Sequence, residues 1–224
     1  MKSLLIILFL APMAPHLVET SANAASWQLA HMIDNRGRTI PRWFHGAQTL
    51  AFENSARPET HGKQRCGMWC WAASAQMVFN YNGADVQQED FVKALFGDTR
   101  NSPANNLALI QSMIFYGRDR NQRPIQVQVS TVEPDANLLI QDLTAGHLFI
   151  TGIYYPLHLR GASQGHVYVL TGVETLTDPD SGQVFIENVV LRDPERGKAS
   201  RRTMPWNEFL SNRMWLVQTR VSVN

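Results

Sequence analysis

The chain has 224 residues, of which 44% are hydrophobic, and it contains six tryptophans. This is enough apolar material for one compact domain or two packed lobes around a shared cleft. The formal net charge is only +1, and this balance argues against a nucleic acid or an anionic membrane surface as the partner.

The first 24 residues have the three parts of an export signal. Lys2 gives a positive start, the run LLIILFLAPMA gives a short apolar segment, and Ala22-Asn23-Ala24 gives an A-x-A cleavage site. The apolar run is too short to span a bilayer. We therefore expect residues 1–24 to be a signal peptide. The mature protein should be secreted or periplasmic, with no stable membrane association.

Residues 25–61 are mixed and polar, and we interpret them as an N-terminal extension with a strand near WQLAHMI. The passage that follows, Q-R-C-G-M-W-C-W, holds both cysteines of the chain and leads into an apolar run that favours a helix. Cys70 would begin that helix, where unpaired backbone N–H groups favour a negative charge on the sulfur. The side-chain amide of Gln64 can donate to the oxyanion that forms when a thiolate attacks a carbonyl.

Two structural alternatives compete with a catalytic Cys70. A Cys66–Cys70 disulfide is sterically conceivable because a glycine lies between the two residues, and it would block the nucleophile. Zinc is disfavoured because two thiols at this spacing lack the paired ligands that a closed site needs. No nucleotide-binding or metal-binding motif is present, so we expect no cofactor and no metal.

Helical spacing and stop signals predict four helices, over residues 71–81, 86–97, 103–117 and 134–144, with Asp85 as the cap of the second. Strand patterns predict five strands, in the runs IQVQVS, HLFITGIYY, HVYVLTGVE, QVFIENVVLRD and MWLVQTRVSV. Most helices precede most strands, which is an α+β order. His166 opens the third of these runs, so its imidazole would stand at a strand terminus, and it is our candidate for the base.

Gln64, Cys70 and Trp71 resemble the Q-x5-C-W segment of the papain-like cysteine peptidases. The plant and lysosomal signature C-G-[SA]-C-[WY] is one residue shorter than C-G-M-W-C-W, so the likeness is to the compact bacterial branch. That branch includes bacteriocin-processing and secreted effector proteases. The resemblance implies a papain-like α+β domain over residues 62–224, with an N-terminal helical lobe and a C-terminal antiparallel sheet lobe.

The resemblance also implies roles for individual residues. In the bacterial branch a histidine opens one strand and an Asp-Pro closes the next, which selects His166 over His147 and adds Asp193. Cys70 and His166 would form a thiolate–imidazolium pair, and Asp193 would orient the ring. Gln64 would bind the oxyanion.

The implied function is a secreted cysteine peptidase that cleaves a protein or peptide substrate through an acyl-thioester, as a bacterial effector or toxin does. An inhibitor or immunity protein is a candidate partner. Two alternatives stay open, a transglutaminase or glutamine deamidase with the same triad, and a non-catalytic binding module closed by the disulfide. The basic stretch that includes Arg192 and Arg196 is interpreted as a solvated loop rather than a binding patch.

Overall fold

The structure is a computed structural model, and it describes residues 24–34, 36–114, 117–155 and 164–224. Apart from Ala24, the predicted signal peptide lies outside the described residues. Within these ranges, no helix combines the length and the apolar character needed to cross a membrane.

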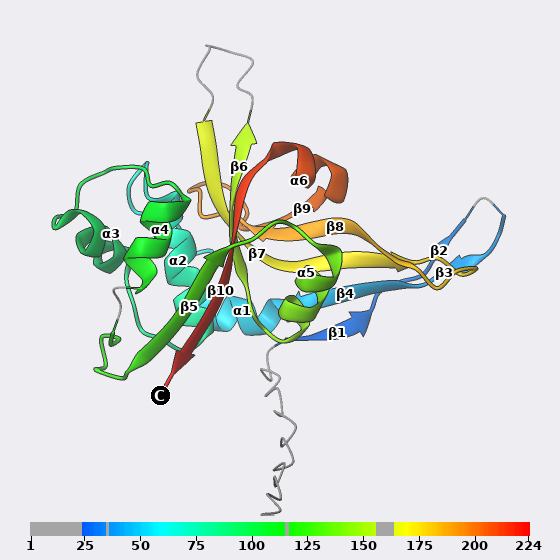
Figure 1. Cartoon of the computed structure of the whole chain (residues 1–224), viewed down its shortest axis with the longest axis horizontal. Helices are drawn as coiled ribbons and strands as arrows, with labels where there is room; N and C mark the ends of the chain where they lie inside the picture. The colour runs from blue at the N-terminus through cyan, green and yellow to red at the C-terminus, as the bar shows by residue number, and fades with distance from the viewer. Residues whose placement is uncertain (1–23, 35, 115–116, 156–163) are drawn as a thin grey trace, which may run out of the picture.

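The predicted α+β fold is confirmed. The helices are α1 (Thr49–Ala56), α2 (Cys70–Tyr81), α3 (Gln88–Phe96), α4 (Asn106–Ile114), α5 (Ala136–Thr144) and α6 (Trp206–Asn212). The first five strands are β1 (Ala24–Gln28), β2 (Met32–Ile33), β3 (Thr39–Ile40), β4 (Arg42–Ala47) and β5 (Ile125–Thr131). The others are β6 (Phe149–Tyr155), β7 (Gln164–Thr177), β8 (Val184–Arg192), β9 (Arg201–Pro205) and β10 (Arg213–Val223). Figure 1 shows α2, α3 and α4 grouped on one side of the large antiparallel sheet.

The long strand β7 organises the sheet. Its N-terminal half pairs with β6 and its C-terminal half pairs with β4, while β8 pairs with it from Val169↔Arg192 to Thr177↔Val184. The strand order β1-β4-β7-β6-β10-β5 follows, with β8 paired to β7 and β9 paired to β8. Because β8 ends opposite Val169, the residue after it emerges beside the start of β7. This register brings position 193 next to His166.

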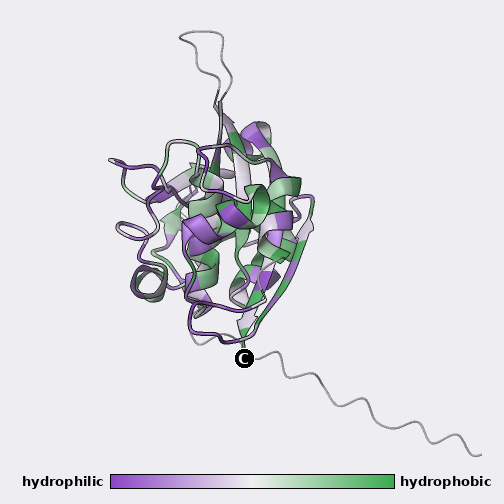
Figure 2. Cartoon of the chain, turned by 90° about the vertical axis from the view of Figure 1, so that its left-hand side faces the viewer, coloured by the Kyte–Doolittle hydropathy of each residue, from purple (hydrophilic) through white to green (hydrophobic). Residues whose placement is uncertain are grey.

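Helix α2 lies in the core and packs on β7. Its small alanines allow the helix to approach the strand closely, and Ser74 Oγ donates to the carbonyl of Val167 at 3.3 Å. Trp71 is 0% exposed, as expected for a core residue, and its indole N–H donates to the carbonyl of Ser102. Truncating so large a buried side chain typically costs about 3–5 kcal/mol. In Figure 2 hydrophobic residues concentrate on the central helices and strands, and hydrophilic residues dominate the loops.

Residues of the expected N-terminal extension are built into the fold. Strand β4 pairs with β7, and β1 pairs with β4 from Ala24↔Ala47 to Gln28↔Trp43. Helix α1 buries Phe52 and Ala56 in the same core as α2. The strand expected near WQLAHMI is divided: Trp27 and Gln28 end β1, which pairs with β4, and Met32 and Ile33 form β2, which pairs with β3.

The start of α3 differs from the prediction. Asp85 does not cap this helix, which begins three residues later at Gln88. Gln87 is the N-cap, and the Asp90 carboxylate accepts from its backbone N–H at 2.9 Å in a capping box. The capping box places the first turn beyond Asp85, whose own backbone N–H donates to Asp119.

Candidate active site

Cys70 is the first residue of α2, as predicted, and it is half-buried. The N-cap residue, Trp69, provides no side-chain cap for this end of the helix. The first N–H groups of a helix have no partner inside the helix, so they favour an anion there. Cys66 and Cys70 are both free thiols. The disulfide that would block Cys70 is not formed.

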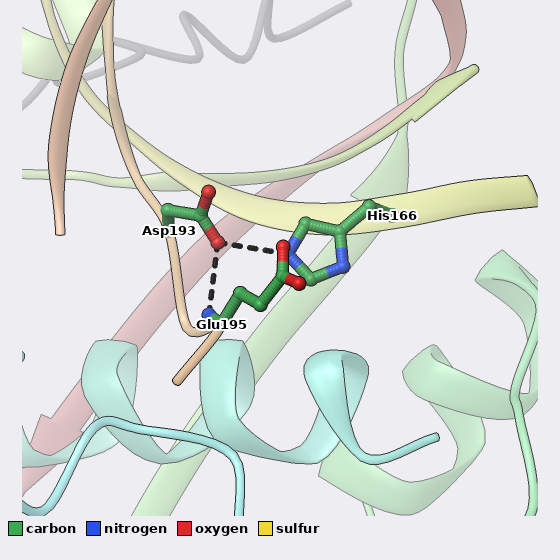
Figure 3. Close-up of side chains that lie close together, drawn as sticks. All are labelled: His166, Asp193 and Glu195. Atoms are coloured by element: carbon green, nitrogen blue, oxygen red, sulfur yellow. Dashed lines mark hydrogen bonds and ion pairs between the residues drawn. The ribbon is translucent and has the colours of Figure 1, made fainter. Parts of the chain in front are cut away.

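His166 and Asp193 are in direct contact. The ring Nε2 of His166 lies 2.9 Å from Oδ1 of Asp193, and the backbone N–H of Glu195 donates to the same oxygen at 2.8 Å. Figure 3 shows these bonds and the second ring nitrogen pointing away from Asp193. The Asp193 carboxylate is completely buried, whereas the His166 side chain keeps partial exposure. The bond at Nε2 leaves Nδ1 for another partner.

Cys70 is that other partner of the ring. The pKa of His166 is raised from 6.5 to about 9, although burial alone lowers it. The increase comes from the hydrogen bonds to Asp193 and to Cys70 and from the negative charge on both. A pKa of about 9 favours the protonated ring at neutral pH, with Cys70 and the Asp193 carboxylate as its two partners.

The Asp193 carboxylate is stabilised in its charged form. Burial raises its pKa, but the hydrogen bond from His166 and the backbone N–H of Glu195 outweigh this effect, and the pKa is lowered. Nearby positive charge adds to the decrease, because the guanidinium of Arg202 lies 3.5 Å from Oδ2 of Asp193. A charged acceptor at this place fixes the orientation of the ring.

Gln64 lies beside the segment that follows Asp193, and it is largely buried. Its Nε2 donates to the carbonyl of Gly67 at 3.0 Å, and its backbone N–H donates to Pro194 at 2.8 Å. One of the two amide hydrogens is thus used within the protein, which leaves the second for a ligand. Gln64 lines a cavity of about 310 Å³, whose walls also include Cys66, Glu195 and Arg196.

Other candidates from the sequence lie elsewhere. His147 Nδ1 is 3.4 Å from Oδ1 of Asp142, so this histidine has a different carboxylate partner from His166. Trp69 is buried and donates to the carbonyl of Arg100, whereas Met68 is 46% exposed. Of the two residues before Cys70, only Met68 is free to meet a ligand.

The family model described as the Peptidase_C39 like family matches residues 52–223. The chain belongs to this family. The match spans most of the chain, from within α1 to the end of β10, and it identifies a cysteine peptidase. The resemblance to the papain-like superfamily, drawn from the residues around Cys70, is thereby confirmed. No curated protein matches the chain.

The peptidase also gathers donors that could suit a cation. Within the described ranges, donor atoms of His166, Asp193 and Glu195 all lie within 4.8 Å of one another (Figure 3). The shared Asp193 oxygen already accepts two hydrogen bonds, and the Glu195 carboxylate pairs with Lys198. Because the shared Asp193 oxygen and the Glu195 carboxylate already have protein partners, we assign Asp193 to holding the ring rather than to a metal.

Sequence reasoning missed a second layer around His166. The ring of Tyr168 meets the imidazole edge-on, with centroids 4.7 Å apart. Arg202 donates to the hydroxyl of Tyr168 at 3.1 Å and also faces Asp193. The basic stretch of the sequence contains Arg202, but the spacing of its residues does not predict the contacts of Arg202 with Tyr168 and Asp193. Arg192 of the same stretch is buried in the core of the peptidase, not in a solvated loop.

Proposed function

We propose that the protein hydrolyses peptide bonds through Cys70, His166 and Asp193, with Gln64 as an oxyanion donor. The observation that carries this proposal is the imidazole of His166, bonded on one side to Asp193 at 2.9 Å and on the other to the thiol at the start of α2. A nucleophile, a base and an orienting group in hydrogen-bond contact are the signature of covalent acyl transfer.

In the first half of the reaction the Cys70 thiolate attacks the carbonyl carbon of the substrate. The oxyanion receives hydrogen bonds from the Gln64 amide and the backbone N–H of Cys70. The imidazolium of His166 then gives its proton to the leaving nitrogen, the C–N bond breaks, and an amine departs. The product on the enzyme is a thioester of Cys70.

In the second half a water molecule enters the place of the amine. His166, now neutral, takes a proton from this water as the oxygen attacks the thioester. The C–S bond breaks, a carboxylic acid leaves, and the proton stays on His166 opposite a regenerated thiolate. Asp193 keeps the ring in one orientation and stabilises its charge throughout.

Product analysis tests this proposal directly. The reduced mature protein would be incubated with denatured casein, and the peptides would be analysed by mass spectrometry. We expect new pairs of termini that have gained one water, and none from the Cys70→Ala or His166→Ala variants. Glutamine side chains converted to glutamate, or cross-linked to lysine, with no cleaved backbone would instead establish the deamidase or transglutaminase.

We also propose that the peptidase is exported and acts as an effector in a reducing compartment. Support comes from residues 1–24, which have the composition of a cleavable signal. Cleavage after Ala24 would leave Ala25–Gln28 to pair with β4. A free catalytic thiol is at risk of oxidation outside the cell, and a reducing destination preserves it. N-terminal sequencing of protein from the periplasm and the medium tests export, and a start at Ala25 is expected.

A further inference from the structure

Two segments that are distant in sequence, residues 59–65 and the loop 193–200, lie together beside the proposed site. Lys63, which precedes the oxyanion residue, is 130 positions from Asp193, yet its ammonium donates to the Asp193 carbonyl at 3.2 Å. The same ammonium donates to the carbonyl of Lys198 at 2.6 Å. Glu59 accepts from the backbone N–H of Ser200, also at 2.6 Å. Residues 59–65 and the loop 193–200 therefore form one bonded unit.

Arg196 closes this unit at its outer edge. Its Nε donates to the backbone carbonyl of Gln64 at 2.6 Å, and one terminal nitrogen donates to the carbonyl of Arg65 at 2.8 Å. The guanidinium fork thus holds two consecutive carbonyls. Together with the bond from Gln64 N–H to Pro194, it ties both backbone polar groups of Gln64 to the loop that carries Asp193.

Arg196 is an exposed residue, so its order must come from these bonds. Fixing a long exposed side chain costs conformational entropy. Charge-assisted hydrogen bonds offset this cost when both donor nitrogens of the guanidinium meet an acceptor, as they do here. Its removal leaves no cavity in the core. The effect of a substitution should therefore fall on the position of Gln64 rather than on the fold.

We propose that Arg196 is a positioning residue of the peptidase site, which sets the Gln64 amide relative to Cys70 through the Gln64 backbone. This inference rests on the proposed function. Arg196 also lines the cavity beside Gln64, but its hydrogen bonds run to backbone carbonyls and not to Cys70. An oxyanion donor must stand within a fraction of an ångström of its place to be effective, so a small movement of its backbone slows acyl transfer.

Two reactions of the Cys70 thiol can show whether Arg196 positions the Gln64 amide or instead affects the thiol itself. Iodoacetamide transfers a carboxamidomethyl group to sulfur with loss of iodide, and no oxyanion forms. With p-nitrophenyl acetate, sulfur attacks the ester carbonyl, an oxyanion forms, and p-nitrophenolate leaves behind an acetyl-thioester. Loss of Arg196 should slow only the second reaction, because only the second needs Gln64.

The experiment compares both rates in the wild type, Arg196→Ala, Arg196→Lys and Lys198→Ala, after subtraction of the rate of Cys70→Ala. We expect Arg196→Ala to acylate about 10- to 100-fold more slowly. Its iodoacetamide rate at Cys70 should change less than about twofold. Arg196→Lys should be impaired as well, since an ammonium does not present a planar fork.

Lys198→Ala is the matched control, a cation removed from the same loop, and should match the wild type. Millimolar guanidinium ion should restore part of the acylation rate in Arg196→Ala.

Each outcome decides between the inference and the function on which it rests. Acylation by Arg196→Ala at the wild-type rate overturns the inference and leaves the peptidase proposal intact. An equal fall in both rates also overturns it, because Arg196 would then act on the Cys70–His166 pair. A wild-type thiol that reacts with neither reagent overturns the peptidase proposal itself. Arg196→Lys carries the same comparison if the alanine variant fails to fold.

Discussion

Asp193 is the residue at which charge and hydrogen bonding can be separated. Asparagine keeps an oxygen that accepts from His166 and removes the charge, whereas alanine removes both. We expect Asp193→Asn to lower kcat/KM by less than about tenfold and Asp193→Ala by about 100-fold or more, since the ring then loses its orientation.

The measurement is peptide hydrolysis over a range of pH values. The Asn variant should also lose activity at a lower alkaline pH than the wild type, because the Asp193 charge helps raise the pKa of His166. Equal losses in the two variants would show that the charge, and not the orienting bond, is what matters.

The raised pKa of His166 also predicts how stability depends on pH. Its value of about 9 in the folded protein exceeds the 6.5 of an ordinary histidine, so the folded state binds this proton more tightly. The resulting stabilisation is complete below about pH 6.5 and disappears as the pH rises through about 9. We expect the stability difference between the wild type and His166→Gln to fall by an amount on the order of 3 kcal/mol between these limits.

Urea unfolding of both proteins at pH 6 and pH 10 measures this difference. The paired comparison removes the titration of groups that both proteins share. A difference that does not change with pH would mean that His166 does not take up its proton more tightly in the folded state.

At the scale of elements, an ion pair between the buried Arg192 and the partly exposed Glu53 joins α1 to the end of β8. Arg192 is 1% exposed, bonds to the carboxylate of Glu53, and stacks over the ring of Phe52 at 4.9 Å. Burial lowers the pKa of Arg192, and Glu53 opposes that effect. Glu53→Gln leaves the buried cation without its counter-charge, so we expect a loss of about 3–5 kcal/mol in the free energy of unfolding.

Urea unfolding at neutral pH provides the test. The double variant Arg192→Met/Glu53→Leu should recover much of the loss, because an apolar pair of similar size needs no desolvation of charge. Arg201→Ala is the matched control from the same basic stretch. Its partner Glu174 is 4.0 Å away at a partly exposed site, so the change should stay within about 0.5 kcal/mol. A Glu53→Gln variant as stable as this control would contradict the assigned role.

The elements that the sequence predicts well are those with a strong local pattern. Helix α2 and strands β5 to β8 and β10 lie where their periodicity and turn signals place them. Strand β4, R-W-F-H-G-A, has no clean alternation, and its burial is decided by pairing with β7, about 130 residues away in sequence. Helix α6 has only seven residues, too few for a periodic pattern.

The site divides in the same way. Cys70 and Gln64 stand in one short motif, and His166 opens a run with a strand pattern. Asp193, and the choice of His166 over His147, come from the resemblance to the bacterial branch of the family. Lys63 and Arg196 bond to residues about 130 positions away, and Arg202 reaches Asp193 only through the pairing of β8 with β9. No sequence motif marks these three residues. Glutamine as the N-cap of α3 was missed because Asp85 is the stronger capping type.

At the scale of the whole molecule, the fold depends on residues that precede the predicted peptidase domain. Phe44 of β4 packs so closely on Gly172 that a Cβ there would come 2.2 Å from its ring. Phe52 and Ala56 of α1 are fully buried. We therefore expect residues 62–224 alone to lack a cooperative unfolding transition, because the edge of β7 and the face of α2 would be exposed.

The control for this truncated chain is a protein of residues 24–224, which keeps β1, β4 and α1. Circular dichroism with thermal melting compares the two. We expect a sharp transition from the longer chain and a broad one, with aggregation, from the shorter. A shorter chain that melts cooperatively within a few degrees of the longer one would place the domain boundary at residue 62 after all.

In the proposed mechanism, everything depends on the activation of the Cys70 thiol by His166. The most direct measurement treats the unreduced mature protein with an epoxysuccinyl inhibitor and maps the adduct by mass spectrometry, with His166→Ala as the control. We predict an adduct at Cys70, not at Cys66, that falls sharply in the control. If labelling appears only after reduction, the site is the same and its thiol is gated by oxidation. No adduct at Cys70 even after reduction, or an equal adduct in His166→Ala, would contradict the claim.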